Sequence, residues 1–380
     1  MTKVAVNQLL LAINAGSSSV KCALFTYAPP PTLLARAILG CTGATCAPAL
    51  LAWIDAQAAH GVVAAVGHRI VHGGPIYTQP QPITPRVRDD LARLVSFAPN
   101  HLPDEIAIID VLEAHEPGIP QVACFDTAFH ERMPEVARRL PIPAAYDRRG
   151  VRRYGFHGLS YTYLMEELSR VAGADAARGR IVLAHLGNGS SLAAVRDGIS
   201  LDTTMAFTPI GGVVMSTRSG DLDPGVVTYI GRSDGLSSER VEDILSKESG
   251  LLGLSGSTSD MQQLLARQLD DASAQLAVRS YVYSVVKAIG SFAAVLGGLD
   301  TLVFSGGIGE HAGEIRARVC DALAFLGVAF DSASNDAHGA IISRDDSCVV
   351  VRVIPTNEEL MIARATYRVV AAGERHAGDR

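Results

Sequence analysis

Apolar and polar residues alternate along this chain in short blocks, and the first blocks show the pattern clearly. Leu9 to Ile13 is apolar and ends at Asn14, where a polar turn begins. The turn is Ala15-Gly16-Ser17-Ser18, and a second apolar-rich run extends from Ser19 to Phe25. Two runs of strand length joined by a short turn predict a β-hairpin whose N–H groups and hydroxyls can converge on an anion. An ordinary polar hairpin stays open as the alternative, because Gly and Ser are common in all turns.

The same block pattern returns in the second half of the chain. Ile181 to Leu186 is apolar, Gly187 to Ser191 has the composition of a turn, and Leu192 to Arg196 resumes a strand. Gly189-Ser190-Ser191 thus matches Gly16-Ser17-Ser18 in place. Two phosphate-sized hairpins in one chain indicate duplicated domains that face each other across a nucleotide cleft.

Further apolar runs of strand length alternate with segments of helical composition, which predicts an α/β fold. The predicted strands are Val62 to Val66, Gln121 to Phe125, Thr301 to Phe304 and Val349 to Ile354. The predicted helices include one capped by Asp104 that runs to about His115, Tyr161 to Ala172 capped by Ser160, Asp260 to Gln268, about Asp271 to Val295, and a last helix that starts within Pro355 to Glu359.

Length and composition limit the classes of function. A chain of 380 residues is longer than one core usually supports, so two domains are expected. With 48% hydrophobic and 19% charged residues, the chain is not disordered. The formal charge of −6 and the single Trp provide neither a basic surface nor a stacking platform, so nucleic acid is not an expected partner.

Cysteine usage and hydropathy bear on the compartment. The six cysteines are scattered without a Cys-x-x-Cys pair, which predicts reduced thiols in a cytoplasmic protein. Asn7 and Gln8 interrupt the N-terminal apolar run, which argues against a signal peptide. Tyr281 to Leu299 carries Lys287 and several glycines, so a buried helix is expected there and no membrane span.

Candidate chemistry follows the ends of the predicted strands, where open α/β sheets place their functional residues. One strand runs into Gly67-His68-Arg69-Ile70-Val71-His72-Gly73-Gly74. Arg69 is always charged and needs an anion as its partner. That anion can be a structural carboxylate or a substrate, and both alternatives stay open. His68 and His72 can be core or turn histidines whose ring nitrogens are hydrogen-bonded within the protein, or they can be residues that bind a ligand. Asp126 directly follows the strand that ends at Phe125.

The second half contributes further candidates. Arg218 lies in a long loop with Asp221 and Asp223, a set that also fits a salt-bridged surface turn. The glycine-rich segment Ser305 to His311 joins a strand to a helix, so its N–H groups suit a phosphate, or its small residues leave room for a base and a ribose. It does not match Gly-x-Gly-x-x-Gly, and the chain has no Walker A loop.

Together these motifs resemble the acetate kinase family, in the family's order and over nearly the whole chain. The resemblance implies two duplicated ribonuclease H-like domains, as in actin, sugar kinases and the Hsp70 ATPase. It implies a discontinuous N-terminal acid-binding domain, 1–127 plus 360–380, and a nucleotide-binding domain, 128–359. It also implies a cytoplasmic homodimer that uses ATP and Mg²⁺, or Mn²⁺, to convert acetate reversibly to acetyl phosphate and ADP. The segments that carry the resemblance are Asn14 to Lys21, Gly67 to Gly74, Phe125 to His130, Tyr154 to Gly158, His185 to Ser191, Thr217 to Pro224 and Pro355 to Glu359.

The resemblance implies a role for each residue that matches a family motif. The implied catalytic residues are Asp126, His157 and Arg218, and the implied metal positions are Asn14 and Glu358. The implied acid-binding residues are Arg69, Val71, Asn100, Phe156 and Pro209, and the implied ATP-binding residues are Lys21, Ser17, Ser19, His185, Leu186, Gly187, Asn188, Gly189, Asp260, Met261, Gln262, Gly307, Ile308, Gly309, Glu310 and His311.

Phosphoryl transfer to a carboxylate fits these residues on electrostatic grounds. The acid is already ionised near neutral pH, so the main obstacle is the approach of one anion to another. Arg69 and Arg218 can neutralise both parties, while the metal ion bridges phosphate oxygens and a fixed in-line geometry supplies the entropy term. On this view, Asp126 orients an arginine or a water molecule of the metal rather than acting as a general base.

Three departures from the family's usual pattern bear on selectivity. The acyl-pocket loop usually reads Ala-Pro-Leu-His-Asn-Pro, whereas residues 98–103 read Ala-Pro-Asn-His-Leu-Pro. Asn100 therefore adds polarity to the implied pocket, unless Leu102 fills the space. Ile210-Gly211-Gly212 replaces Leu-Glu-Gly, and Gln262 stands where an arginine near the nucleotide is common.

Acetate kinase is the leading functional hypothesis, and two alternatives stay open. Propionate kinase differs by one methylene of pocket volume, worth only about 1–3 kcal/mol of discrimination. An ATP-binding regulatory module on the same fold is the third candidate, but it has no use for both Arg69 and Arg218. A sugar kinase is disfavoured, because a neutral hydroxyl nucleophile needs a base and not paired arginines.

Overall fold

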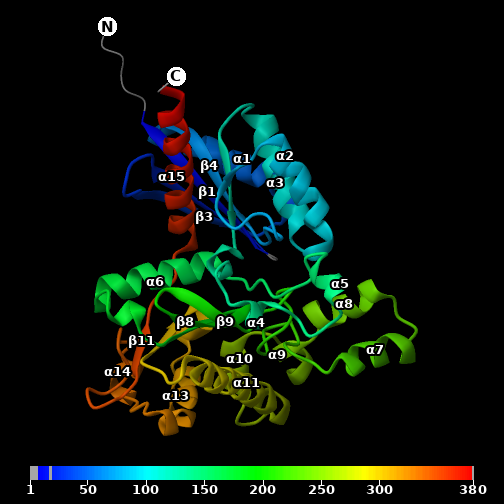
Figure 1. Ribbon diagram of the computed structural model, residues 1–380, viewed down its shortest axis with the longest axis vertical. Helices are drawn as coiled ribbons and strands as arrows, with labels where there is room; N and C mark the ends of the chain where they lie inside the picture. The colour runs from blue at the N-terminus through cyan, green and yellow to red at the C-terminus, as the bar shows by residue number, and fades with distance from the viewer. Residues whose placement is uncertain (1–6, 17–18, 379–380) are drawn as a thin grey trace. The chain divides into compact units, whose positions relative to one another are not determined.

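The computed structural model describes residues 7–16 and 19–378. The chain divides by its contacts into two compact units. Unit 1 comprises Met1–Phe129, Gly158–Tyr163 and Asn357–Arg380, and unit 2 comprises His130–His157 and Leu164–Thr356. Each unit contains one β-sheet with helices packed on it (Figure 1), so the predicted α/β class is confirmed.

The sheet of unit 1 has six strands in the order β3-β2-β1-β4-β6-β5. Strands β1, β2 and β3 form an antiparallel meander, and β4 and then β6 add in parallel on the other side of β1. The two-residue strand β5 pairs with β6 at the edge. The bounds are β1 Gln8–Ala15, β2 Val20–Thr26, β3 Leu33–Leu39, β4 Val62–Ile70, β5 Gln81–Pro82 and β6 Gln121–Phe125.

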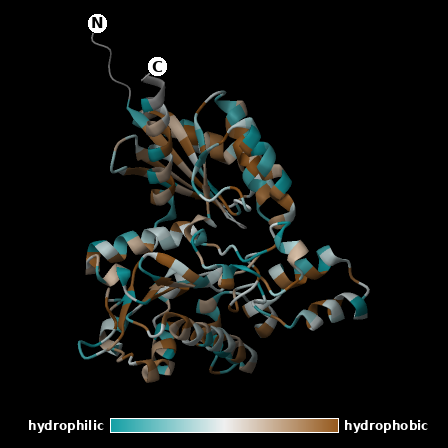
Figure 2. Cartoon of the chain, viewed as in Figure 1, coloured by the Kyte–Doolittle hydropathy of each residue, from teal (hydrophilic) through white to brown (hydrophobic). Residues whose placement is uncertain are grey.

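Both faces of this sheet are covered, which explains why β1 is apolar at successive positions. Leu9, Leu11 and Ile13 pack in one cluster with residues of α1 (Ala47–Ala56) and α3 (Leu102–His115), whereas Leu10 and Ala12 pack in a second cluster with residues of α15 (Glu358–Gly378). A strand buried on both faces has no polar side and therefore reads as a continuous apolar run. Figure 2 shows the strands coloured mainly as hydrophobic and the helices α2 and α3 with mixed colours.

The sheet of unit 2 repeats the topology of the first. Its order is β11-β10-β7-β8-β9, with β7, β8 and β9 antiparallel and with β10 and β11 parallel to β7. When β7 to β11 are matched to β1, β2, β3, β4 and β6, the strand order and every pairing direction agree. The predicted duplication is therefore confirmed at the level of topology. The bounds are β7 Ile181–Leu186, β8 Ser190–Arg196, β9 Ile199–Thr203, β10 Thr301–Ser305 and β11 Val350–Val353.

Helices connect and cover the two sheets. The long helix α11 supplies nine buried residues to unit 2 and packs against β8 and α9. The α-helices are α1 Ala47–Ala56, α2 Pro85–Arg93, α3 Leu102–His115, α4 Glu135–Arg138, α5 Ala144–Asp147, α6 Gly158–Ala172, α7 Pro224–Ser233, α8 Ser238–Lys247, α9 Gly250–Ser255, α10 Met261–Arg267, α11 Ala272–Leu296, α12 Gly306–His311, α13 Gly313–Ala322, α14 Ser332–Asp336 and α15 Glu358–Gly378, and the 3-10 helices are Gly43–Cys46, Ala58–His60, Leu94–Phe97, Ala128–His130, Ala176–Arg178 and Ala324–Leu326.

Three local predictions are wrong in detail. Asp104 does not cap α3, because the helix already begins at Leu102 and Asp104 lies in its first turn, where its charge still favours the helix dipole. Ser160 does not cap α6, because that helix begins at Gly158. In the second hairpin the strand resumes at Ser190, so the turn is Gly187 to Gly189 and the two serines belong to β8.

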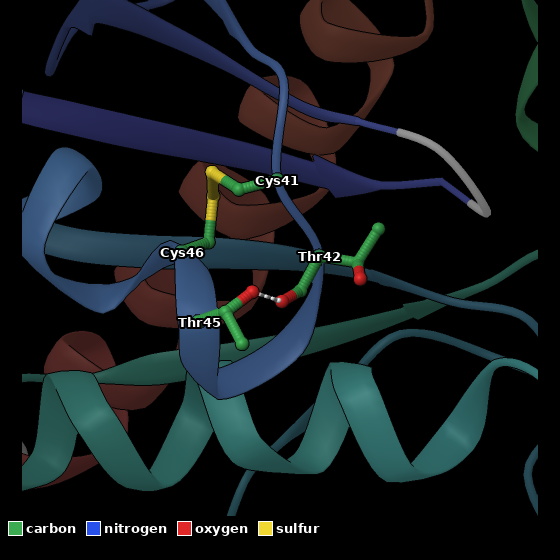
Figure 3. The surroundings of a disulfide bond; sticks show 4 residues. All are labelled: Cys41, Thr42, Thr45 and Cys46. Carbon is green, nitrogen blue, oxygen red and sulfur yellow. Dashed lines mark hydrogen bonds between the residues drawn. A yellow bond between two sulfur atoms is a disulfide. The ribbon is translucent and has the colours of Figure 1, made fainter.

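The prediction of six reduced thiols is wrong for one pair. Cys41 and Cys46 form a disulfide between the end of β3 and the 3-10 helix Gly43–Cys46 (Figure 3). Thr45 Oγ1 donates a hydrogen bond to the carbonyl of Thr42, and this tight turn brings the two cysteines together. The five-residue separation matches no common cysteine motif, so no pattern in the sequence indicated the pairing. The other four cysteines are free thiols.

Within the described residues, no helix is both long and apolar enough to cross a membrane. The expectation for Tyr281 to Leu299 is met in this respect, since most of that segment lies in α11, whose inner face is buried in the core of unit 2.

Candidate active site

The carboxyl ends of β4 and β6 bring Arg69 and Asp126 together in unit 1. Asp126 N donates to the carbonyl of Ile70, which continues the parallel pairing one residue past β6. Arg69 Nη2 donates to Asp126 Oδ2 at 2.7 Å, and Nη1 donates to the carbonyl of Ala15 at 3.0 Å. The Arg69 side chain is 12% exposed and Asp126 is fully buried. Arg69 therefore has a structural carboxylate as one partner, which was one of the two alternatives left open by the sequence. An arginine has five N–H donors, and the hydrogen bonds to Asp126 and Ala15 use two of them.

Glu105 joins this pair and was missed by the sequence prediction. It lies in the first turn of α3 and is 2% exposed. Its two carboxylate oxygens accept from the Val71 backbone N–H at 3.0 and 3.2 Å, and Oε1 lies 3.7 Å from Arg69 Nη1. The available signal was its spacing, because Glu105 is three residues after Leu102 and four before Ile109 and so shares a helix face with them.

The charges in this group act on one another through a buried environment. Burial by itself lowers the pKa of Arg69, but attraction by Asp126, Glu105 and Glu358 outweighs burial and raises the pKa above its ordinary value. Burial raises the pKa of Glu105 to about 8, although the Arg69 charge and the Val71 N–H both act to lower it. Arg69 therefore stays charged, and Glu105 takes up a proton more easily than an ordinary glutamate does.

A second group in unit 1 gathers oxygen atoms around Asn14. Asn14 Nδ2 donates to Glu358 Oε2 at 2.7 Å and to Glu359 Oε1 at 3.1 Å. Ser160, from α6, donates to the other oxygen of Glu358. Lys21 is exposed and lies directly opposite Asn14 across the first hairpin, so the two side chains project from the same face.

This donor set fits a hard divalent cation. Carboxylate and amide oxygens are its preferred ligands, and Mg²⁺ is usually held by one or two carboxylates together with substrate phosphates. Among the described residues, no group of three or more His, Cys, Asp or Glu side chains could hold a metal ion unaided. Asn14 and Glu358 would therefore share such an ion with phosphate oxygens.

The predicted acid-pocket residues of unit 1 differ in burial. Val71 is 1% exposed and is fixed by the hydrogen bond of its N–H to Glu105. Asn100 is half-buried in the connection between the 3-10 helix Leu94–Phe97 and α3. Leu102 is fully buried at the start of α3.

In unit 2, His157 contacts both strands of the second hairpin, β7 and β8. His157 Nδ1 and Ser191 Oγ form a hydrogen bond of 2.8 Å, and the His157 and His185 rings lie 4.3 Å apart at a tilt of 32°. His185 and Ser191 are directly opposite each other in the pairing of β7 with β8, which explains how both reach His157. His157 itself has a left-handed backbone, with φ of 60°, at the residue before α6.

Arg218 reaches the same hairpin turn. A Cβ placed on Gly189 would lie 3.3 Å from His157 Nε2 and 3.4 Å from Arg218 Nη1, so both side chains converge on the space that this glycine leaves open. Arg218 Nη1 also donates to the carbonyl of Pro209 at 3.1 Å. Asn188 anchors the Arg218 loop, because its carbonyl accepts from Ser216 N at 3.2 Å.

The glycine-rich segment after β10 packs on the second hairpin. It forms the short helix α12 where the sequence predicted a turn. Gly306 has φ of 76°, and a Cβ there would lie 2.7 Å from the carbonyl oxygen of Leu186, so only glycine permits this approach. Glu310 Oε1 accepts from Gly306 N at 2.8 Å and from Thr356 N at 3.2 Å, which ties the segment to the chain that follows β11.

The other predicted positions are distributed as follows. Asp260 caps α10 through Gln263 N, Met261 is buried in the core of unit 2, and Gln262 is exposed. Ile308 is partly buried against the same core, and Phe156 is 1% exposed. Ser19 is half-buried beside the first turn, whereas Ser17 lies outside the described residues.

The fold and these groups define a class of protein: a duplicated ribonuclease H-like α/β protein that carries arginine, histidine and carboxylate groups at its strand ends. Residues 49–364 match the model of the acetokinase family. The chain belongs to that family.

Known proteins agree with this family over nearly the whole length. An acetate kinase of Rhodopseudomonas palustris is 43% identical, with 97% of this chain and 100% of the relative covered. The crystal structure of Porphyromonas gingivalis acetate kinase is 35% identical, with a TM-score of 0.83 and coverage of 96% of this chain and 100% of that one. The crystal structure of a propionate kinase from Francisella tularensis is 33% identical, with a TM-score of 0.86 and coverage of 95% and 100%.

Proposed function

We propose that this protein is an acetate kinase, which transfers the γ-phosphoryl group of ATP reversibly to acetate by direct in-line attack. The observation that carries the proposal is the Arg69–Asp126 pair at the ends of β4 and β6. A buried arginine that is held in place by one carboxylate has further N–H donors with which it can bind a substrate carboxylate. Membership of the acetokinase family supports this assignment.

The residues divide the electrostatic work of the reaction. Arg69 binds the carboxylate of the acid, with Val71, Asn100, Phe156 and Pro209 as the acyl-binding residues. Arg218 and His157 stabilise the charge on the phosphoryl group during transfer, when that charge is shared between the attacking and leaving oxygens. Asp126 orients Arg69 through their hydrogen bond, and the acid needs no general base, because it is already ionised.

ATP and a divalent cation complete the reaction. Mg²⁺, for which Mn²⁺ is a substitute, is assigned to Asn14 and Glu358, and when bound it supplies positive charge to the phosphate oxygens. Ser160 and Glu359 keep Glu358 and Asn14 in place. The nucleotide is assigned to the hairpin residues Lys21, Ser17, Ser19 and His185 to Gly189, and to Asp260 to Gln262 and Gly307 to His311.

Several broader properties belong to the same proposal. Residues 1–127 plus 360–380 form the acid-binding domain, and residues 128–359 form the nucleotide-binding domain. The protein acts as a cytoplasmic homodimer. These properties follow from the family resemblance.

Propionate kinase is the second candidate. Two observations keep it open: Asn100 changes the acyl-pocket loop that selects the acid, and the crystal structure of a propionate kinase has the same fold, with a TM-score of 0.86. A regulatory ATP-binding module is a weaker alternative, because it gives no reason to bury Arg69 beside two carboxylates.

The test is an acyl-phosphate trap. Purified protein is incubated with ATP, Mg²⁺ and hydroxylamine together with formate, acetate, propionate or butyrate, and the hydroxamate is measured. We expect acetate to give the highest kcat/KM, and chelation of the metal to abolish the product. Arg69→Ala and Arg218→Ala are each expected to lose several orders of rate while the protein stays folded. If no acid yields hydroxamate, the kinase assignment fails, and if propionate is preferred, the second candidate replaces the first.

A further inference from the structure

Two buried carboxylates share a single guanidinium group at the proposed acid-binding position. Asp126 is fully buried and forms the 2.7 Å hydrogen bond with Arg69, while Glu105 is 2% exposed and lies 3.7 Å from the same side chain. Glu358 acts on Arg69 as well, from the group that is assigned to the metal ion. Among the three side chains Arg69, Asp126 and Glu105, one carboxylate balances the guanidinium charge, so the protonation of Glu105 decides whether the three are neutral together or carry one net negative charge.

The charge of this group matters for an anionic ligand. A neutral group leaves Arg69 able to attract the carboxylate of an acid. A net charge of −1 repels it, and low solvent exposure leaves that repulsion poorly screened. The repulsion acts close to Arg69, because the oxygens of Glu105 accept hydrogen bonds from the N–H of Val71, which is two residues from Arg69.

The charged groups that act on Glu105 come from three places. Arg69 on β4 favours its ionised form, whereas Asp126 after β6 and Asp104 in the same turn of α3 disfavour that form. The strongest influence is burial, which raises the pKa of Glu105 to about 8.

Besides β4, α3 packs on α2 and on two 3-10 helices. Arg88 of α2 pairs with Asp110 of α3 at 2.7 Å, so these two charges balance each other. The 3-10 helices Gly43–Cys46 and Leu94–Phe97 carry no ionisable side chain apart from Cys46, which is in the disulfide. His72, the residue after Val71, accepts a hydrogen bond from Gly74 N and contacts Phe97 edge-on.

We propose that Glu105 is a positioning residue that must hold a proton for the acid to bind, so that it makes acid affinity, and not the rate of phosphoryl transfer, depend on pH. The inference rests on the proposed function. Protonated Glu105 keeps Val71 in place through its carbonyl oxygen and leaves the Arg69–Asp126 pair neutral. Loss of the proton keeps the same contacts but adds a negative charge beside Arg69.

The kinetic test compares the pH dependence of KM and of kcat for acetate. For the wild-type protein, the KM for acetate is expected to rise about tenfold from pH ~7 to pH ~9, as a single group with a pKa of about 8 loses its proton, while kcat changes little. The acid itself is fully ionised over this range, so its own titration does not contribute. In Glu105→Gln, which keeps the shape and the acceptor, KM is expected to vary less than about twofold over the same range.

The matched control is Glu116→Gln, the same chemical change at an exposed position after α3. Its KM should rise with pH as in the wild type. A wild-type KM that is flat over this range overturns the proposal, and so does a Glu105→Gln protein that keeps the full rise.

A second measurement needs neither activity nor a variant of Glu105. In protein labelled with ¹⁵N-valine, the amide signal of Val71, assigned by its loss in Val71→Ile, should shift with pH around a midpoint near 8 because its N–H is bonded to Glu105. Absence of a titration above pH ~6 overturns the inference even if the kinase assay succeeds. If the Val71 signal titrates but the protein makes no acyl phosphate, Glu105 does carry the proton and the proposed function is the part that fails.

Discussion

Arg69 Nη2 and Asp126 Oδ2 form a hydrogen bond of 2.7 Å between the ends of two parallel strands, and the carboxylate is fully buried. The pair forms because β4 and β6 are neighbours in the sheet. Removal of one partner from a buried ion pair is costly, because the other charge is left without compensation. The two side chains are therefore expected to act as one unit in both stability and catalysis.

A double-mutant cycle tests this coupling. Arg69→Ala and Asp126→Ala should each lower kcat/KM for the acid by about 10³-fold, and the double variant should be little worse than the poorer single variant. Steady-state hydroxamate assays give the three ratios, with circular dichroism as the check on folding. Independent, multiplicative losses would contradict a shared role.

The Ser191–His157 bond predicts a separate effect on turnover. Ser191→Ala removes the 2.8 Å partner of His157 Nδ1, so the ring loses one of the contacts that orient it, and kcat should fall about tenfold with little change in the KM for the acid. Stopped and continuous assays of acyl-phosphate formation provide the two constants.

Unit 2 offers a matched control for that prediction. Ser200 Oγ and His130 Nδ1 also lie 2.8 Å apart and are buried, and neither residue has a proposed part in the reaction. Ser200→Ala should lower stability without the drop in kcat. If both serine variants lose turnover equally, the effect is structural, and the orientation of His157 is not its cause.

Asn100→Leu is expected to change acyl selectivity. Asn100 is half-buried and Leu102 is already fully buried in the start of α3, so the loop has a polar residue where the family usually has an apolar one. An apolar side chain at position 100 should raise the ratio of propionate to acetate kcat/KM by about threefold to tenfold. Competition between the two acids in the hydroxamate assay measures this ratio, and an unchanged ratio would remove Asn100 from the pocket.

His68 predicts a loss of stability in acid. It is fully buried, its Nε2 lies 2.7 Å from Gln121 Oε1, and burial lowers its pKa to about 4, although the Gln121 hydrogen bond acts to raise it. Between pH ~4 and pH ~6.5 the unfolded chain therefore binds more protons than the folded one. The contribution of His68 to the free energy of unfolding is complete above this range, and the free energy falls by up to about 3 kcal/mol as the pH drops through it.

Urea unfolding at several pH values measures this slope. His68→Gln keeps a donor for Gln121 but cannot titrate, so its stability should depend less on pH across the window. The same substitution at the exposed His60 is the control. A His68→Gln slope equal to that of the wild type would assign the acid loss to other groups.

The disulfide predicts the number of reactive thiols. Six cysteines are present and one pair is bonded, so thiol titration of the denatured, unreduced protein should count four, and six after reduction. Cys46→Ser removes the cross-link that closes this short loop. In the chain-entropy model, the free energy of unfolding should then fall by roughly 2 kcal/mol. A count of six without reductant would contradict the bond.

Much of the fold could be predicted from local pattern. The runs at β1, β7 and β10, the long helix α11 and the strand-end position of Asp126 all follow from burial, turn residues and helical composition within a few residues. The ends of the elements were predicted less accurately. Ser160 and Asp104 are residue types that often cap helices, but both lie inside helices, because the flanking glycine and proline allow α6 and α3 to start earlier.

The sequence by itself determined the strand and helix segments, the repeated hairpins and the identity of the charged residues. Only the tertiary structure decided which of those residues meet. Glu105 reaches the N–H of Val71 from 34 positions away, Ser160 reaches Glu358 from 198 positions away, and Cys41 closes on Cys46 through a turn with no motif. The reason is physical: a local pattern specifies whether a side chain is buried, but the strand order and the packing of helices on each face choose its buried partner, and that partner sets its charge.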